Sequence, residues 1–157
     1  MKYMEDKSNN ILEAIGREFT STKDINLLLK NVFGIIVSSY NIERGMISIY
    51  HRDEDEISVD IHHGYTADEV QRGIYRPGEG IIGSVVQTGE PVIIPDISRE
   101  SRFLNRTGAD RGSSDDIISF ICVPVAIHNS VIGAISVDIR NNSQRDLSEE
   151  LHILTTI

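Results

Sequence analysis

An arginine-rich stretch offers the clearest chemistry for binding a ligand. Between residues 99 and 111, four arginines accompany two acids and give a local charge of +2, in a chain whose net charge is −9. The four are Arg99, Arg102, Arg106 and Arg111. A guanidinium group binds carboxylate or phosphate through paired hydrogen bonds, so we expect an anion anchor at Arg102 or Arg106, with Phe103 as the lid of a pocket. The alternative is that these arginines pair with the many acids around them.

The one cysteine, Cys122, lies in an apolar stretch and is a weak candidate for catalysis. A nucleophilic thiol needs a nearby base, cation or helix N-terminus to lower its pKa, and the neighbouring residues supply none. A buried free cysteine commonly serves as a small hydrophobic residue. An enzyme that uses Cys122 is therefore a minor alternative.

The histidines and the acidic run at residues 53–56 do not form a recognisable metal site. His62 and His63 are adjacent in an expected strand, so their side chains point to opposite faces. His51 could face one of them, but two ligands without a third give poor zinc or iron chemistry. The acidic run lacks the spaced oxygen ligands and the glycine of a calcium loop, and it fits a solvated turn better.

Residues 78–83 match the G-x-G-x-x-G pattern of a dinucleotide-binding loop. That function requires a preceding strand, a following helix of ordinary length and a parallel β-α-β unit. Here Pro77 precedes the pattern, and Thr88 and Gly89 end the next helix within three turns. We expect a structural role instead, with tight turns at the first two glycines and close packing of a helix against the sheet at Gly83.

Hydrophobic periodicity predicts a pair of helices at the start of the chain. Apolar residues recur at three-, four- and seven-residue steps over residues 4–19 and again over residues 25–36. Ser21, Thr22 and Asp24 can supply an N-cap to the second helix, so the break between the two is a turn.

Hairpins and short helices follow. Period-two alternation predicts strands over residues 46–51 and 57–62, and Thr66 and Glu69 form a capping-box pattern for a short helix after them. Further on we expect a helix at 80–88, a strand at 92–94, a long polar loop at 96–116, a second hairpin at 117–127 and 131–139, and a helix from about Asp146. Hairpins without β-α-β units imply an antiparallel sheet flanked by helices, in the α+β class.

Length and composition restrict the kind of protein. The 157 residues suit one domain, and contents of 39% hydrophobic and 25% charged residues are typical of a globular chain. With 15 basic and 24 acidic residues, we expect no direct contact of this segment with nucleic acid or an anionic membrane surface. The longest apolar run is far short of the roughly 18 residues of a membrane span, and one cysteine fits a reducing compartment, so we expect a cytoplasmic domain.

Two longer stretches carry a resemblance to a known family. Residues 76–96 resemble the central motif of GAF domains, and residues 120–138 resemble the last two core strands of that family. The match extends over residues 11–140, which is nearly the whole chain. It implies an α+β sandwich in which a six-stranded antiparallel sheet has helices on both faces and a small-molecule pocket on one.

Within this family the chain is most similar to the amino-terminal domains of nif-specific transcriptional activators of the NifA type. Residues 73–80, 102–108 and 116–124 carry that likeness. It implies a regulatory sensor that precedes an ATPase module acting on sigma-54 RNA polymerase and a helix-turn-helix. Some members respond to 2-oxoglutarate, a dicarboxylate that suits an arginine-bearing pocket.

The resemblance and the loop together give our expectations for the site. The expected ligand-binding residues are Arg76, Arg102, Phe103, Arg106 and Ser119. The expected effector is a small molecule such as 2-oxoglutarate, and we expect no catalysis, metal or resident cofactor. GAF relatives that reduce methionine sulfoxide use several cysteines, which this chain lacks.

We interpret residues 1–157 as a single GAF sensory domain. It divides into N-terminal helices at 1–41, a sheet core with the pocket at 42–140, and the start of a truncated output helix at 146–157. We expect a ligand to close the 96–116 loop and to act on the output through that last helix. The alternative is a module that forms a homodimer or binds a regulatory protein through the apolar stripe of Met4, Ile11 and Ile15, whose other interpretation is packing on the sheet.

Overall fold

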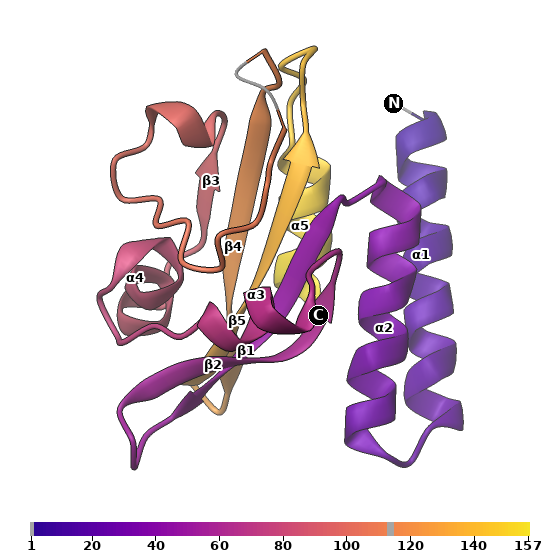
Figure 1. Ribbon diagram of the computed structural model, residues 1–157. Helices are drawn as coiled ribbons and strands as arrows, with labels where there is room; N and C mark the ends of the chain where they lie inside the picture. The colour runs from indigo at the N-terminus through magenta and orange to yellow at the C-terminus, as the bar shows by residue number, and fades with distance from the viewer. Residues whose placement is uncertain (1, 113–114) are drawn as a thin grey trace.

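Two long helices form a hairpin at one side of the molecule. The computed structural model describes residues 2–112 and 115–157, with side chains from residue 6 onward. Helices α1 (Lys2–Ser21) and α2 (Ile25–Tyr40) run side by side, as predicted (Figure 1). Asp24 is the N-cap of α2, and its carboxylate accepts hydrogen bonds from two backbone N–H groups of the first turn.

An antiparallel sheet forms the centre of the fold. Its strands are β1 (Arg44–His51), β2 (Glu56–His63), β3 (Val92–Ile94), β4 (Ile118–Ile127) and β5 (Ser130–Arg140). Their order is β2-β1-β5-β4-β3, so the two predicted hairpins meet where β1 pairs with β5. The turn between β4 and β5 consists of His128 and Asn129, which both have the positive φ that a tight hairpin turn requires.

The described residues form five strands, whereas the family resemblance implied six. At the β2 edge the sheet continues as a single bridge, in which Ile57 and Tyr75 exchange two backbone hydrogen bonds of 2.7 and 2.9 Å. The chain then leaves the edge, because Pro77 has no backbone N–H to donate and Gly78 turns with a φ of 86°. A sixth strand is thus reduced to one residue pair.

Short helices and the long loop complete the two layers around the sheet. They are α3 (Ala67–Arg72), α4 (Gly80–Thr88), the 3-10 helix η1 (Ile97–Arg99) and α5 (Ser148–Thr156). Thr66 and Glu69 form the predicted capping box of α3. Helix α4 and the described residues of the 96–116 loop lie on one side of the sheet, whereas α1, α2 and α5 lie on the other (Figure 1).

The alternation of side chains in β4 and β5 separates two hydrophobic cores. Ile121 and Val137 are fully buried among the side chains of α1, α2 and α5. Phe120 and Cys122 are equally buried on the other face, beneath α4. Because side chains alternate with a period of two, the sequence of these strands fixes which residues reach each core.

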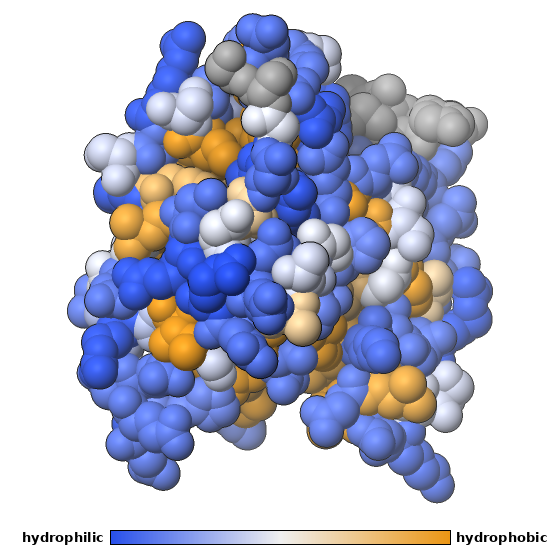
Figure 2. Space-filling model, viewed as in Figure 1, coloured by the Kyte–Doolittle hydropathy of each residue, from blue (hydrophilic) through white to orange (hydrophobic). Residues whose placement is uncertain are grey.

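The outer surface is mostly polar, with apolar side chains exposed at the end of the helical hairpin (Figure 2). Phe19, Ile25 and Leu27 lie there and are between 51% and 61% exposed. Ile11 and Ile15 of the predicted stripe are buried in the core instead, and the side chain of Met4 lies outside the described residues. Of the helices in the described part of the chain, none is both long and apolar enough to cross a membrane.

The glycines of residues 78–83 form a turn against which α4 packs. Gly78 and Gly80 have positive φ values of 86° and 59°, which favour glycine. A Cβ atom at Gly83 would lie 2.2 Å from the carbonyl oxygen of Arg76. Gly83 therefore allows close packing of the helix on the preceding turn, and not on the sheet as the sequence had suggested.

We expect Gly83→Ala to lower the free energy of unfolding by about 2–3 kcal/mol, because the added methyl group overlaps backbone that the turn holds in place. Gly34→Ala is the matched control. Gly34 lies within α2, no atom outside its own stretch of helix comes within 4 Å of an added Cβ, and alanine favours the helix by up to about 1 kcal/mol. Urea denaturation measures both variants, and an unchanged stability of Gly83→Ala would contradict the close packing.

Candidate functional site: a closed cavity under the arginine loop

The 96–116 loop encloses a cavity against the sheet. Met46 of β1 and Phe120 of β4 form its floor, and Ile81 and Ile82 of α4 form a wall. The enclosed volume is about 10 Å³, which is room for roughly one water molecule. The cavity is therefore closed to larger ligands in this arrangement of the loop.

Phe103 lines this cavity from the loop side. Its ring packs edge-to-face on Phe120, with the ring centroids 5.1 Å apart and an interplanar angle of 77°. The guanidinium carbon of Arg111 lies 5.0 Å from the centroid of the Phe103 ring. Movement of this ring would therefore enlarge the cavity.

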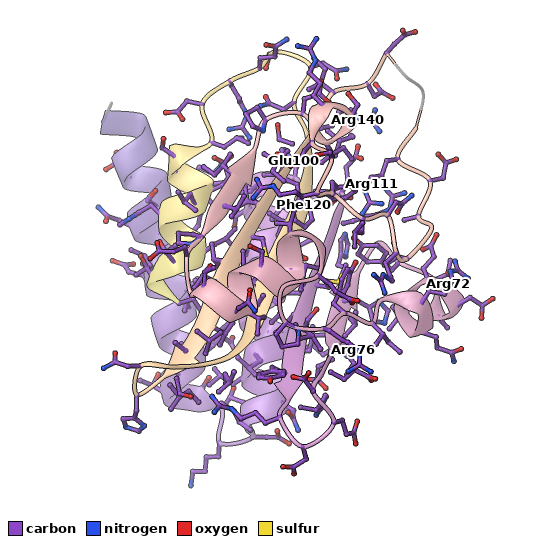
Figure 3. All side chains as sticks on the ribbon, turned by 90° about the vertical axis from the view of Figure 1, so that its left-hand side faces the viewer. Arg72, Arg76, Glu100, Arg111, Phe120 and Arg140 are labelled. Atoms are coloured by element: carbon purple, nitrogen blue, oxygen red, sulfur yellow. The ribbon has the colours of Figure 1, made fainter. Side chains whose placement is uncertain are left out.

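Arg111 and Asp138 form a buried ion pair beside Phe103. The distance from Arg111 Nε to Asp138 Oδ2 is 2.7 Å, and the two side chains are only 11% and 1% exposed. Arg111 also donates hydrogen bonds to the side-chain oxygen of Asn105 and to the hydroxyl of Tyr65. Figure 3 shows Arg111 close to Phe120. This pair fixes the loop to the sheet, because separating it would leave a buried charge without a partner.

Polar atoms near this ion pair remain unsatisfied. Burial raises the pKa of Asp138 above its ordinary value, and the positive charges of Arg111 and Arg44 oppose that rise. Asp138 Oδ1 and Arg44 Nε have no hydrogen-bond partner among the described residues. Buried polar atoms normally have partners, so this end of the cavity suits a polar group of a ligand or a water molecule.

Arg76 and Arg106 meet around Glu79 on the outer side of the cavity. Glu79 Oε2 accepts a hydrogen bond from the backbone N–H of Arg76 at 2.9 Å and lies 3.5 Å from Arg106 Nη2. Arg106 also lies over the ring of Tyr75, 5.4 Å from its centroid. Burial raises the pKa of Tyr75 to about 12, although Arg111 and Arg106 oppose the rise. The side chain of Arg76 is exposed and reaches Asp55 at 3.9 Å.

Arg102 and Arg99 lie apart from the cavity. Arg102 pairs with Glu100 at 2.8 Å and Arg99 with Asp96 at 3.4 Å, and both arginines are exposed. With Arg106 on Glu79 and Arg111 on Asp138, all four loop arginines have an acidic partner. The structure thus displays the alternative that the sequence left open, in which the arginines pair with nearby acids.

Ser119 lies outside the cavity, on the other face of the sheet from Phe120. Its side chain is fully buried. The hydroxyl donates to the carbonyl oxygen of Pro95 at 2.7 Å and accepts from Asn141 Nδ2 at 3.2 Å. Ser119 therefore joins β4 to the start of the loop and does not reach the Phe103 ring.

Sequence reasoning missed Asp138, Tyr65 and Tyr75, and it gave Arg111 no special role among the arginines. Asp138 had a local signal, because it is the one charged residue in the apolar run of residues 131–139, and a charge in a buried strand needs a partner. No local pattern marks the two tyrosines, which reach the cavity only after the chain bends back from β2 and α3.

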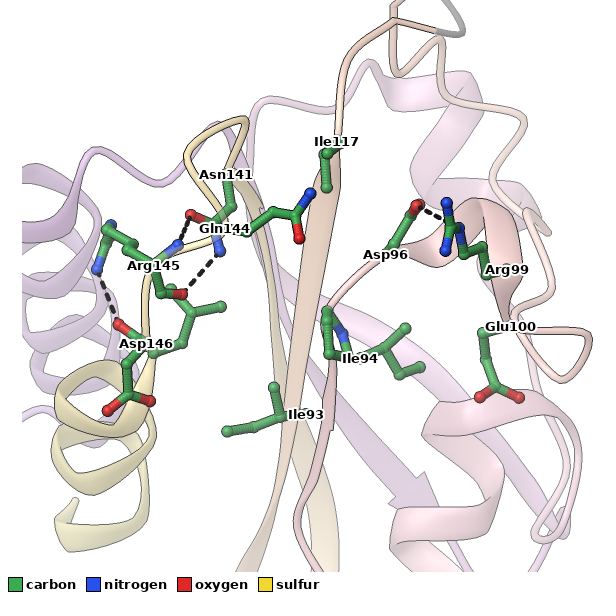
Figure 4. Close-up of a pocket in the computed structure, with 12 residues that line it drawn as sticks. Ile93, Ile94, Asp96, Arg99, Glu100, Ile117, Asn141, Gln144, Arg145 and Asp146 are labelled. Carbon is green, nitrogen blue, oxygen red and sulfur yellow. Dashed lines mark hydrogen bonds and ion pairs between the residues drawn. The ribbon is translucent and has the colours of Figure 1, made fainter.

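A second and larger pocket lies between β3 and the start of α5, and we call it the junction pocket (Figure 4). Its volume is about 640 Å³. Ile93, Pro95 and Asp96 line one side, and Asn141, Gln144 and Leu147 line the other. It borders the link between β5 and α5, so it is separate from the Phe103 cavity.

The cysteine and the histidines do not contribute to either pocket. The Cys122 thiol is fully buried in β4, and burial raises its pKa, so little thiolate can form. Within residues 2–112 and 115–157, no group of three or more His, Cys, Asp or Glu side chains is placed to hold a metal ion.

Curated proteins that resemble this chain take part in nitrogen fixation. The protein VnfA of Azotobacter vinelandii is 34% identical over 139 residues, which is 88% of this chain and 27% of VnfA. The Nif-specific regulatory protein of Herbaspirillum seropedicae is 28% identical over 159 residues, which is 98% of this chain and 29% of that protein. This chain spans less than a third of the length of these relatives.

Solved structures share the fold. The A. aeolicus nlh2 GAF domain in an inactive state has a TM-score of 0.82 and 24% identity, covering 98% of this chain and 91% of that one. A free methionine-R-sulfoxide reductase from Neisseria meningitidis has a TM-score of 0.70 and 19% identity, covering 96% and 89%. The GAF domain family model matches residues 24–157. This chain therefore belongs to the GAF domain family.

Proposed function

We propose that this chain is the signal-sensing domain of a Nif-type transcriptional regulator and that it controls an output acting with sigma-54 RNA polymerase. The regulatory role is supported by a Nif-specific regulatory protein that aligns with 98% of this chain. The chain spans 29% of that relative, so the output is expected elsewhere in the parent protein. We expect the domain to work in the cytoplasm.

The observation that carries the sensing role is the cavity beneath the loop. A loop residue, Phe103, lines it, and side-chain contacts hold the part of the loop that follows η1. These contacts are the Arg111–Asp138 ion pair and the hydrogen bond from Arg72 Nε to the carbonyl oxygen of Thr107. A ligand that replaced Phe103 would favour a second position of the loop, and such a difference in affinity between two states is what a sensor requires.

We propose a small anion as the effector, with 2-oxoglutarate as the example to test. Arg106 is the best placed anchor, because its contact with Glu79 is 3.5 Å long and its side chain is 38% exposed. The backbone of Arg76 adjoins the same carboxylate, and its exposed guanidinium group, 3.9 Å from Asp55, is our candidate for holding a second negative group. Since every loop arginine already has an acidic partner, the effector must replace a carboxylate.

We propose that the domain has no catalytic activity. The methionine sulfoxide reductase of similar fold is only 19% identical, which supports a shared fold and nothing more. Cys122 is the one cysteine of the chain, and its buried thiol cannot meet a substrate.

Homodimer formation is a second candidate, favoured by the exposed apolar end of the helical hairpin. Phe19, Ile25 and Leu27 expose more than half of their surface there, and burial in an interface would remove it from water. The stripe first considered for this role contributes Ile11 and Ile15 to the core of the same chain. A regulatory protein could occupy this patch instead of a second copy.

We expect saturating 2-oxoglutarate to raise the melting temperature by about 5–10 °C, because a ligand at a hundred times its dissociation constant adds about 2.7 kcal/mol. Arg106→Gln should abolish this shift. Arg102→Gln is the matched control and should keep it, since Arg102 points to Glu100 on the outer surface. Differential scanning fluorimetry checks the shifts, and equal shifts in the two variants would contradict the proposed anchor.

We expect Arg111→Met to lower the free energy of unfolding by about 3 kcal/mol near pH 7, because it leaves Asp138 buried without a partner. The loss should shrink as the pH is lowered from 7 into the acid range. Burial raises the pKa of Asp138 above its value in the unfolded chain. Protonation of Asp138 therefore stabilises the folded state at low pH, and this contribution is lost as the pH rises.

Arg102→Met is the control for this variant, because its ion pair with Glu100 is exposed and screened by solvent. Urea denaturation of both variants across this pH range measures the difference. A loss for Arg111→Met that is the same at every pH would show that Asp138 is not the group responsible.

We expect the chain to dimerise at micromolar to millimolar concentration and Ile25→Ser to weaken the dimer at least tenfold, because it removes an apolar contact from the interface. Ile127→Ser is the matched control, since Ile127 is 53% exposed but lies at the far end of β4. Sedimentation equilibrium measures both. A chain that stays monomeric, or equal weakening by both variants, would rule out this interface.

A further inference from the structure

A buried polar connection links the start of the loop with the start of α5. Asn141 follows β5 and is 4% exposed, and Ser119 near the start of β4 is fully buried. Asn141 Nδ2 donates to Ser119 Oγ, and Ser119 Oγ in turn donates to the carbonyl oxygen of Pro95. Because the Ser119 side chain is fully buried, the loss of either bond would leave its hydroxyl short of a partner.

The Asn141 amide also fixes the chain ahead of α5. Its Nδ2 donates to the carbonyl oxygen of Arg145 and its Oδ1 accepts from the backbone N–H of the same residue, both at 3.0 Å (Figure 4). Every hydrogen-bonding group of this amide is thereby used. Arg145 then pairs through Nη2 with Glu150 Oε1 at 2.6 Å, and Glu150 is buried in α5.

Helix α5 is in turn bonded to the helical hairpin. Glu149 Oε1 accepts hydrogen bonds from Ser8 of α1 at 2.9 Å and from the hydroxyl of Tyr40 of α2 at 3.1 Å. Ile153 and Leu154 of α5 are buried in the same core as the two long helices. A shift of α5 would therefore reach α1 and α2.

The segments on either side of this connection have room to move. The junction pocket of about 640 Å³ separates Pro95 and Asp96 from Gln144 and Leu147. Gln144 has a positive φ of 51°, which is strained for a residue other than glycine or asparagine. The link ahead of α5 thus borders open space and contains a strained residue, and both features ease a second conformation.

We propose that Ser119 and Asn141 form a relay that couples the position of the 96–116 loop to helix α5. This inference rests on the proposed function, in which an effector moves the loop. When the loop is closed, the Pro95 carbonyl holds the Ser119 hydroxyl, and Ser119 holds Asn141 against Arg145. Displacement of the loop removes the first bond and leaves the Ser119 hydroxyl without its acceptor, so that it can turn away from Asn141. The loss of the Asn141–Ser119 bond then loosens the start of α5.

Hydrogen exchange of the 157-residue chain tests the relay without a ligand, because Phe103→Ala loosens the loop by removing the ring that packs on Phe120. We expect this variant to speed exchange of the α5 amides roughly three- to tenfold relative to those of strand β1, as the loss of one or two hydrogen bonds would. In a Ser119→Ala background, α5 should already exchange faster, and Phe103→Ala should add less than a twofold change.

Ser48→Ala is the matched control background. Ser48 is also a buried strand serine, but its hydroxyl has no partner among the described residues, so the effect of Phe103→Ala on α5 should persist there. Ser119→Cys, which keeps the volume but bonds weakly, replaces Ser119→Ala if that variant does not fold. No change at α5 with Phe103→Ala, or the same change in the Ser119 and wild-type backgrounds, would overturn the relay.

The outcome is separate from that of the effector experiment. A chain that does not bind 2-oxoglutarate can still pass the exchange test, because Phe103→Ala moves the loop in its place. A chain that binds the effector at Arg106 but shows no Ser119-dependent change at α5 has the sensor site without this relay.

Discussion

The pairing of β4 with β5 is the constraint on which the rest of the molecule depends. In this register Phe120 lies opposite Asp138, and Ile121 lies opposite Val137. The first pair therefore faces the loop and α4, and the second faces the long helices. A slip of one residue would bring Asp138 into the helical core and expose apolar side chains to the loop, so the hydrophobic pattern permits only one register.

Asp138 in turn explains why the loop has a defined position. A carboxylate that is 1% exposed needs a positive partner, and Arg111 supplies it from the loop. Once Arg111 is placed, its guanidinium group forms one side of the space that Phe103 occupies. The stretch between residues 100 and 112 contains no helix or strand. The ion pair therefore holds this stretch in place, as backbone hydrogen bonds hold the strands of the sheet.

The sequence predicted elements that have local causes. The capping box at Thr66, the N-cap at Asp24 and the alternation of the strands each depend on residues within a few positions of one another, and all are present. The cavity joins residues far apart, such as Arg111 and Asp138, and no periodicity marks such a pair. The alternation of side chains along a strand could have excluded one predicted residue. Ser119 and Phe120 are adjacent in β4, so their side chains point to opposite faces and only one of them can face the cavity.

The same alternation of side chains determines how a movement on one face of the sheet can reach the other face. The apolar side chains in the middle of the sheet are fully buried and close-packed. A movement transmitted through them would have to displace many side chains together. Where these strands end, hydrogen bonds through the Pro95 carbonyl, Ser119 and Asn141 join the start of the loop to the segment ahead of α5. Hydrogen bonds are directional and can be broken one at a time, so a small movement of the loop is transmitted to the helices at less cost around this edge than through the core.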